Sequence, residues 1–425
     1  MKSSLVFLSL FSLVMQLSAL TIDPIYQSHM VLQQGKPVPV SGTATGKGDV
    51  VVSFGEQKVK AKKKGKTWQA VLAPMTASAE GKTLTVTQGE DTATLDDVVV
   101  GEVWLASGQS NMEWQLAQAR DKDALNQEQI DNLRYYHAVP QVHTRPGVYA
   151  EEFQAKLREG DMYRGTWSVS NKETCRPMSA VGWYFGRKLQ GQLGVPVGII
   201  HVSLGGSEMV AWIPPAVLRQ KHKESVKPRW AESKYVMGWA RRRSLENMGG
   251  DATGLHPYKP GYLYETGIAP WAGFPLAGVI WYQGETDAES PDMKQHERVL
   301  TDLIESWRAV FKEPQLPFLM VQLPRIKDEG KNSTRLMWPE YRQVQQNVAD
   351  AMPGVYCVNT IDLGTTSADV HPPRKLEVGE RLADTAASQV YGKAEVPYIG
   401  PVVKEVKPQG EALCLSFDQD RKSVV

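Results

Sequence analysis

The sequence predicts an α/β protein: a doubly wound domain on a parallel sheet, preceded by a small antiparallel β domain. Two observations lead to this prediction. Between residues 98 and 392, continuous apolar runs of strand length alternate with helical patterns. Between residues 20 and 97, short alternating strands are separated by glycines. A chain of 425 residues also exceeds what one core usually needs.

The first 19 residues have the pattern of a secretory signal peptide. Lys2 gives a short positive region, Leu5 to Leu17 is mostly apolar, and Ser18-Ala19 offers small residues for cleavage. The apolar run is shorter than the roughly 20 residues that a membrane span needs. The alternative is a buried first helix. We expect an exported protein, periplasmic or extracellular, whose mature form has no membrane span.

Residues 20–97 are expected to form the small β domain. Asp49–Phe54 and Thr83–Thr87 each have the composition of a strand, and glycines mark the turns between such segments. Regularly spaced short strands are typical of an antiparallel sandwich. This region contains no catalytic constellation of its own.

Residues 98–392 are expected to form the main domain. Strands without polar alternation are buried on both faces, as in parallel sheets covered by helices. The expected strands are Val98–Ala106, Val197–Ser203, Ala277–Tyr282, Phe318–Leu323 and Val355–Ile361. The expected helices between and after them are Gly182–Leu193, Met293–Phe311, Tyr341–Ala351 and Leu376–Tyr391.

Two segments depart from this alternation. Residues 214–261 are rich in Lys, Arg, Trp and Gly, and we interpret them as an insertion that borders the substrate cleft. Residues 393–425 return to β character as a C-terminal segment of two strands, which cannot bury a face without a neighbour.

Composition narrows the possible partners. The net charge is +1, from 48 basic and 47 acidic residues, so no global field favours nucleic acid. Cys175, Cys357 and Cys414 are too few for a disulfide framework, and buried unpaired thiols are the preferred interpretation over a single bridge. No Cys/His spacing indicates a zinc site, and we expect neither metal nor cofactor.

Ligands of open α/β sheets bind beyond the carboxyl ends of the strands, so residues that follow the apolar runs are candidates. Ser110 lies in the turn Gly108–Met112, directly after the first such run. A serine there can present its hydroxyl at the sheet edge beside backbone N–H groups, which suits a nucleophile. The alternative is that Ser110 only caps the helix that follows.

Two further strand ends offer hydrogen-bond donors. Gly205 and Gly206 let backbone approach a ligand, and one of their N–H groups is a candidate oxyanion donor; an ordinary turn is the alternative. Gln283 leaves its strand with a neutral amide that can serve the same purpose. For Glu285 we prefer a structural role, which is to orient the loop, fix Gln283 or cap the next helix.

The pair Asp369 and His371 follows the last expected strand. Histidine can take and return a proton near neutral pH, and an aspartate two residues earlier can turn back to fix its tautomer. An incidental surface histidine is the alternative. Together, the four strand ends supply every part of a serine hydrolase.

These motifs resemble a known family. The segments Gly108–Met112, Trp281–Glu285 and Asp369–Pro372, in this order, are similar to those of sialate O-acetylesterases and related carbohydrate acetylesterases of the SGNH hydrolase superfamily. The resemblance implies a flavodoxin-like sheet and a metal-free serine mechanism that releases acetate. It implies Ser110 as nucleophile, His371 as base and Asp369 as the residue that orients it.

The resemblance also implies the remaining site residues. The oxyanion hole is expected from the Ser110 N–H, an N–H of Gly205 or Gly206, and Gln283, which stands where the wider superfamily has Asn. Asn111 and Glu285 are assigned to substrate binding.

The expected activity is removal of O-acetyl groups from carbohydrates, with sialic acids as the first candidate. A xylan or pectin acetylesterase is the closest alternative, since a triad does not define the substrate. A non-catalytic exported sugar-binding protein is the alternative from another class. Arg325 and Lys375 are candidate partners for a sialic carboxylate. Four aromatics are candidate sugar platforms, although core packing is preferred for each: Trp114, Trp212, Tyr282 and Trp338.

Overall fold

The computed structural model describes residues 20–417 except 122–124, 127–128, 235, 328–335 and 397–402. The predicted signal peptide, residues 1–19, lies outside the described residues. No helix in the described part is both long and apolar enough to cross a membrane.

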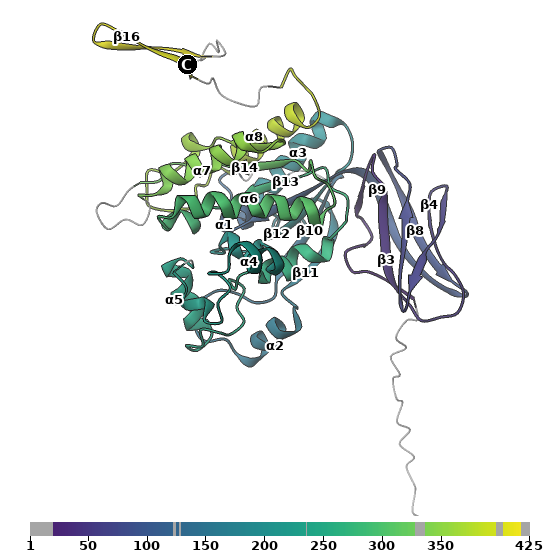
Figure 1. Cartoon of the computed structure of the whole chain (residues 1–425). Coiled ribbons are helices and arrows are strands. Elements are labelled where there is room, and N and C mark those ends of the chain that lie inside the picture. Colours follow the sequence, from purple (N-terminus) through teal and green to yellow (C-terminus); the bar gives the residue numbers. More distant parts are fainter. Residues whose placement is uncertain are drawn as a thin grey trace, which may run out of the picture.

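The N-terminal region folds as a small β domain, as expected (Figure 1). One sheet has the strand order β1–β3–β7–β6. In a second group of strands, β4 pairs antiparallel with β5 on one side and with β8 on the other. Buried and exposed residues alternate along these strands, because one face of each packs on a shared core around Trp68 and Leu84. The strands are β1 (Leu20–Ile22), β2 (Val31–Gln33), β3 (Val38–Ala44), β4 (Val50–Phe54), β5 (Gln57–Lys60), β6 (Lys62–Lys64), β7 (Thr67–Leu72) and β8 (Ser78–Gln88).

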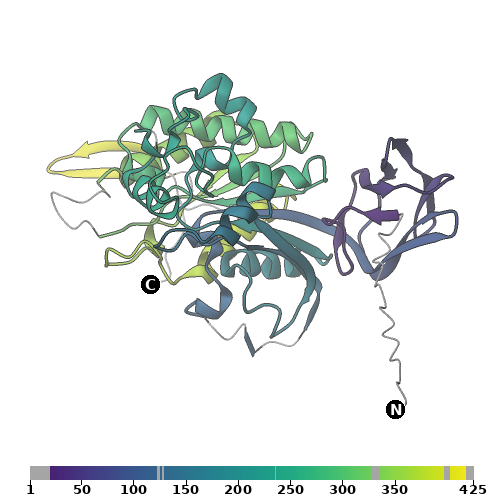
Figure 2. The same ribbon diagram turned by 90° about the horizontal axis from the view of Figure 1, so that it is seen from below.

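One long strand, β9 (Asp91–Gly108), joins the two domains (Figures 1 and 2). Its first half pairs with β8 in the β domain, and its second half, from Glu102 onward, lies between two parallel strands of the main sheet. The predicted boundary between residues 97 and 98 therefore falls inside a continuous strand. The nucleophile candidate follows the end of this strand directly.

The main sheet has the order β11–β10–β12–β9–β13–β14–β15. The five strands β12, β9, β13, β14 and β15 are all parallel. Numbered by their order in the sequence, they lie side by side in the sheet as 2-1-3-4-5, which is the flavodoxin-like arrangement. The α/β prediction is thus confirmed. The bounds are β10 (Ile130–Pro140), β11 (Tyr163–Ser170), β12 (Val197–Ser203), β13 (Gly278–Tyr282), β14 (Phe318–Val321) and β15 (Val355–Val358).

Helices cover both faces of this sheet. α3 (Ala180–Leu193) and α8 (Lys375–Gln389) pack on the face that carries Trp104 and Tyr282. Successive side chains of a strand point to opposite faces of the sheet, so every second residue of these strands is buried under α3 and α8.

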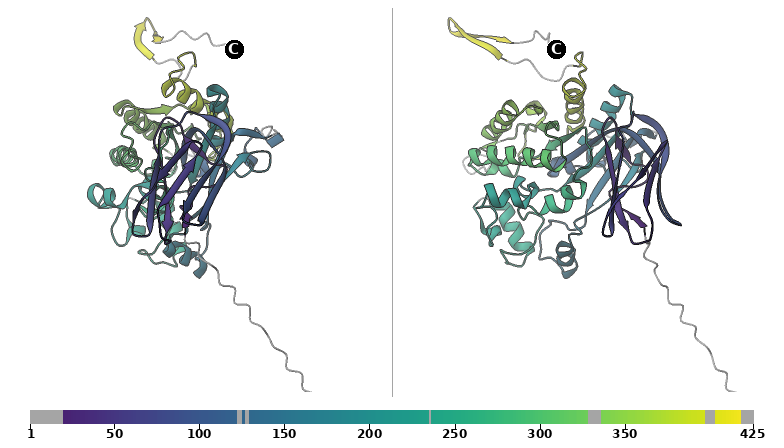
Figure 3. Two further views of the ribbon diagram at one scale, coloured as in Figure 1. Left: turned by 90° about the vertical axis from the view of Figure 1, so that its right-hand side faces the viewer. Right: turned by 45° about the vertical axis from the view of Figure 1, so that its right-hand side comes forward.

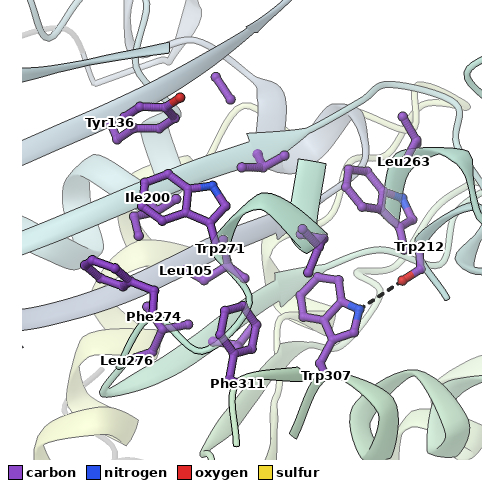
Figure 4. Packing of buried hydrophobic residues seen from close by; sticks show 14 of the residues in the cluster. Leu105, Tyr136, Ile200, Trp212, Leu263, Trp271, Phe274, Leu276, Trp307 and Phe311 are labelled. Atoms are coloured by element: carbon purple, nitrogen blue, oxygen red, sulfur yellow. Dashed lines mark hydrogen bonds between the residues drawn. The ribbon is translucent and has the colours of Figure 1, made fainter. Parts of the chain in front are cut away.

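The opposite face is covered by α6 (Met293–Val310) and α7 (Trp338–Ala351). Leu105 and Ile200 of the sheet pack there in one cluster with Trp307 of α6, whose indole N–H donates to the Trp212 carbonyl at 2.9 Å (Figure 4). Tight aromatic packing on both faces holds the strand ends that carry the candidate site.

The chain between β9 and β12 adds elements that the sequence pattern did not reveal. β10 and β11 form an antiparallel pair beyond β12, and α2 (Glu151–Glu159) lies between them in sequence. The insertion at 214–261 contains α4 (Pro215–Lys221) and α5 (Gly238–Asn247). α4 lies beside α6, and Lys221 at its end donates to Asp302 of that helix, whereas α5 lies farther out (Figure 1).

The C-terminal β segment is a hairpin, β16 (Val403–Gln409) and β17 (Ala412–Phe417), set apart from the rest (Figures 1 and 3). Every residue in its two strands is exposed, including Cys414.

All three thiols are free, and Cys175 is buried as predicted. Cys357 is half-buried and Cys414 is exposed, which corrects the expectation that each cysteine is buried.

Candidate active site

The carboxyl ends of β9, β12 and β13 bring three of the predicted loops together. Gly108 pairs with Ser203 on one side and Tyr282 on the other. Gly108 has a φ of 139°, and a Cβ there would overlap the Tyr282 carbonyl, so only glycine allows this close approach. The chain then turns directly into α1 (Ser110–Glu113).

Ser110 and His371 lie in hydrogen-bond contact, although 261 positions separate them. Ser110 Oγ is 2.8 Å from His371 Nε2. His371 Nδ1 is 3.2 Å from Asp369 Oδ1, which also accepts from the His371 backbone N–H at 2.9 Å. Ser110 is the first residue of α1 and Gln109 is its N-cap, so the helix-capping alternative for Ser110 is wrong.

His371 and Asp369 differ in exposure. The His371 side chain is 28% exposed, whereas that of Asp369 is 60% exposed. Burial lowers the pKa of His371 from its usual 6.5, and the nearby Lys375 charge lowers it further, while Asp369 acts in the opposite direction. The imidazole is therefore neutral near pH 7, which is the form that can accept a proton.

Ser110 and His371 line a cavity of about 630 Å³. The predicted insertion at 214–261 supplies one wall through Trp239, Tyr258 and two arginines of α5, Arg242 and Arg243. Trp239 and Tyr258 lie over Gly206, whose φ is 73° and where a Cβ would overlap the Tyr258 hydroxyl. The insertion therefore does border the cleft, directly beside the nucleophile candidate.

The structure changes the predicted set of oxyanion donors. Gln283 is buried, and its amide nitrogen already donates to the Ser207 carbonyl at 2.7 Å and to Asp287 Oδ2 at 2.8 Å. The Gly205 N–H donates to Glu113 Oε2 at 2.6 Å. Neither group is available to a substrate, so the prediction for Gln283 is wrong, and of the predicted glycine pair only the Gly206 N–H remains a candidate donor.

Three other donors remain on the cavity wall. Among the described residues, no acceptor contacts the N–H of Ser110 or of Gly206. Gln109 also lines the cavity, and its Oε1 accepts from the N–H groups of Gly284 and Thr286 at 3.4 and 3.3 Å. These contacts hold the Gln109 amide in place and leave its NH₂ for the cavity. Sequence reasoning missed Gln109; its only signal was its position beside the nucleophile candidate.

Asn111 does not bind substrate, because it is fully buried. Its amide donates to Glu285 and, at 2.8 Å, to the Val370 carbonyl in the histidine loop, and its oxygen accepts from Lys375 Nζ. Glu285 reaches the cavity floor but is 3% exposed. We call Asn111, Gln283, Glu285 and Lys375 the buried polar layer. The structural role preferred for Glu285 fits this position better than substrate binding.

Burial shifts the titration of two groups in this layer. It lowers the pKa of Lys375 to about 7 and raises the pKa of Glu285 to about 7. Lys375 is fully enclosed, with its Nζ 5.6 Å from the Trp114 ring centre. Lys375 therefore cannot pair with a sugar carboxylate. Arg325, the other predicted carboxylate partner, is exposed but does not line the cavity.

The predicted aromatics are core residues in three cases: Trp212, Tyr282 and Trp338 are buried. Trp114 stacks on the His371 ring, with centroids 5.3 Å apart, and so supports the base. Among the described residues, no group of three His, Cys, Asp or Glu side chains is arranged to hold a metal ion.

Comparisons with known proteins identify relatives of this chain. A family model described as "Carbohydrate esterase, sialic acid-specific acetylesterase" matches residues 251–388. The sialate O-acetylesterase of Mus musculus is 27% identical over 396 residues, which are 84% of this chain and 70% of the mouse protein. The Homo sapiens enzyme is 28% identical over 374 residues, and the matched part is 80% of this chain and 64% of the human protein.

A solved structure is similar over nearly the whole chain. The crystal structure of a carbohydrate acetylesterase from Xanthomonas citri has 30% sequence identity and a TM-score of 0.74, and the match covers 94% of this chain and 81% of that one. The match includes the β domain as well as the main sheet. The chain therefore belongs to the family of carbohydrate acetylesterases, whose curated members include the sialate O-acetylesterases.

Proposed function

We propose that this chain is a serine esterase that removes O-acetyl groups from sialic acids through an acetyl-serine intermediate. The observation that carries the proposal is the contact between Ser110 Oγ and His371 Nε2, 2.8 Å apart at the wall of a cavity. The similarity to sialate O-acetylesterases supports sialic acid as the sugar.

His371 acts as the general base in this proposal. With its proton on Nδ1, directed at Asp369, the imidazole presents Nε2 to accept the Ser110 proton. Its lowered pKa keeps it neutral and ready at neutral pH. Trp114 supports one face of the ring, and the Asn111 bond to the Val370 carbonyl ties the histidine loop to the nucleophile helix.

Acetyl transfer then follows in two steps. Ser110 Oγ attacks the acetyl carbonyl carbon, its proton moves to His371, and the bond to the sugar oxygen breaks as His371 returns the proton to that oxygen. Water next attacks the acetyl-serine with His371 as base. Acetate leaves, and the proton returns to Ser110.

The negative oxygen formed in both steps needs donors held in advance. We assign this role to the N–H groups of Ser110 and Gly206 and to the Gln109 amide, which line the cavity without another described acceptor. Each such donor typically contributes about 3 kcal/mol to transition-state stabilisation.

Acetate release tests this function directly. Purified protein should release acetate from O-acetylated sialic acid, and a serine-directed fluorophosphonate should stop the reaction. Acetylated xylan and acetylated pectin serve as comparison substrates. Release from these polymers without release from sialic acid would contradict the proposed substrate. Sugar binding without any acetate release would contradict the esterase itself.

We also propose that the chain is exported, on the pattern of residues 1–19. Fractionation of producing cells, with N-terminal sequencing of the recovered protein, tests this. We expect a mature N-terminus near Leu20 outside the cytoplasm. A cytoplasmic protein that retains residues 1–19 would contradict export.

A further inference from the structure

The cavity has an unequal charge distribution that catalysis does not explain. Three arginines line it, Arg145, Arg242 and Arg243, against two carboxylates, Glu285 and Glu289. Glu285 is buried and bonded to Asn111. The reaction itself needs only a neutral acetyl group, so the excess of positive charge requires another reason.

Two of the three arginines have free guanidinium groups. Arg243 is already engaged: its Nη1 donates to the Thr144 carbonyl at 2.5 Å, its Nε lies 3.4 Å from Glu246, and it stacks on Trp239 at 5.4 Å. In the described part of the chain, the guanidinium groups of Arg145 and Arg242 have neither a hydrogen bond nor an ion pair. Both are exposed at the mouth of the cavity.

The loop that carries Arg145 is fastened to α5, the helix that carries Arg242. The buried Asn247 amide donates to the carbonyls of Arg145 and Gly147 at 2.8 and 2.6 Å. Glu246 accepts from the Gly147 N–H at 3.0 Å. Together with the Arg243 bond to Thr144, these contacts fix the backbone positions from which Arg145 and Arg242 extend.

Helix geometry places Arg242 on the same side as the aromatic wall. Trp239 and Arg242 are three residues apart in α5, so they are neighbours on one helix face. Trp239 lies against Gly206, and Gly206 follows Gly205, where a Cβ would lie 3.3 Å from Ser110 Cβ. An acetylated sugar can therefore contact Trp239 next to the nucleophile and still extend toward Arg242.

We propose that Arg145 and Arg242 form a subsite for the carboxylate of an acidic sugar, beside the acetyl ester that Ser110 attacks. This inference rests on the proposed function and deepens it. Arginine suits the task because its planar fork can donate two parallel hydrogen bonds to a carboxylate. Sialic acids and hexuronic acids both carry such a carboxylate, and a neutral xylan chain does not.

The first test measures selectivity in Arg145→Ala, Arg242→Ala and the double variant. The readout is the ratio of kcat/KM for acetate release from O-acetylated sialic acid to that from a neutral O-acetylated xyloside. Each single substitution should lower this ratio about tenfold, and the double variant more, mainly through KM, since each removes a hydrogen bond to a charged group. Arg242→Lys should restore part of the ratio.

A matched control is Arg219→Ala, because Arg219 is an exposed arginine of α4 that does not line the cavity. Its selectivity should equal that of the wild type. A second readout is inhibition of p-nitrophenyl acetate hydrolysis by free N-acetylneuraminic acid. Inhibition should be weaker for the methyl ester of this sugar and weaker in the double variant.

The outcomes separate the subsite from the proposed function. If the wild type deacetylates sialic acid but the arginine variants keep its selectivity, the subsite is wrong and the esterase assignment stands. If an O-acetylated galacturonide is the arginine-dependent substrate instead, the subsite holds and sialic acid as substrate is wrong. A wild type with no preference for either acidic sugar would overturn the subsite.

Discussion

Two of the sequence motifs place polar side chains in different surroundings: some line the wall of the cavity, and others belong to the buried polar layer beneath it. In Gly108–Met112, Gln109 and Ser110 face the cavity while Asn111 points inward. In Trp281–Glu285, Gln283 is buried with both amide hydrogens used. The difference teaches that polar residues of one motif divide into those that contact substrate and those that hold loops together.

The largest effect is expected at the cavity wall. Ser110→Ala removes the nucleophile, and kcat for acetate release should fall by roughly 10⁴-fold or more. The free energy of unfolding should stay close to that of the wild type, because Ser110 does not cap α1 through its side chain. Steady-state kinetics and urea unfolding measure both quantities. A variant with near wild-type turnover would show that another residue is the nucleophile.

A pair of identical substitutions tests the comparison itself. Gln109→Leu removes a cavity donor, so kcat should fall about 10²-fold. It also leaves the N–H groups of Gly284 and Thr286 without their contacts to Oε1, but these contacts are long, at 3.4 and 3.3 Å, so the loss of stability should be smaller than at Gln283. Gln283→Leu leaves the Ser207 carbonyl and Asp287 without this buried partner, so the free energy of unfolding should fall by about 2 kcal/mol.

The two glutamines are therefore expected to differ in which property changes more: turnover for Gln109 and stability for Gln283. Kinetics on p-nitrophenyl acetate and urea unfolding of both variants give the answer. If Gln283→Leu lost turnover about 10²-fold at unchanged stability while Gln109→Leu did not, the assignment of the oxyanion donor would have to be reversed.

A smaller effect is expected from the third member of the triad. Asp369 is largely exposed, and its Oδ1 is shared between the His371 ring and the His371 backbone N–H. Exposed charge pairs contribute little in water, so Asp369→Ala should lower kcat/KM only about tenfold. A loss as large as that of Ser110→Ala would mean that Asp369 becomes enclosed when substrate binds.

The smallest expected change is a shift in pH dependence. Activity needs neutral His371, so kcat/KM should fall as pH drops through its pKa. Because burial and the Lys375 charge lower that pKa, the acid limb should have its midpoint below 6.5. Asp369→Asn removes a group that raises the pKa and should move the limb further down. A midpoint above 6.5 would contradict this electrostatic environment.

The architecture was predictable where burial controls the pattern. β12 and β13 are buried at every position, so their apolar runs were visible in the sequence. β10 and β11 were not found, because their exposed and buried residues follow no clean alternation, and β11 is the edge strand of the sheet. The helix α5 was hidden by its Arg-rich composition and few buried residues.

Within the site, the chemistry of Ser110 and His371 followed from residue type and position after a strand. The oxyanion donors could not be predicted in this way, because an amide can donate to a substrate only if its NH₂ group faces the cavity. Gln109 and Gln283 both follow strands, yet only contacts made by loops far apart in the chain decide which one faces substrate. The subsite arginines come from segments that no motif connects, and packing against Asn247 brings them together.

Covalent labelling is the most direct test of the central claim, which is that His371 activates Ser110 at the cavity wall. The protein is treated with a fluorophosphonate, and the labelled peptide is located by mass spectrometry. The account predicts a single adduct on Ser110, formed much more slowly in His371→Ala. An adduct on another residue that abolishes activity, or full activity with labelled Ser110, would contradict it.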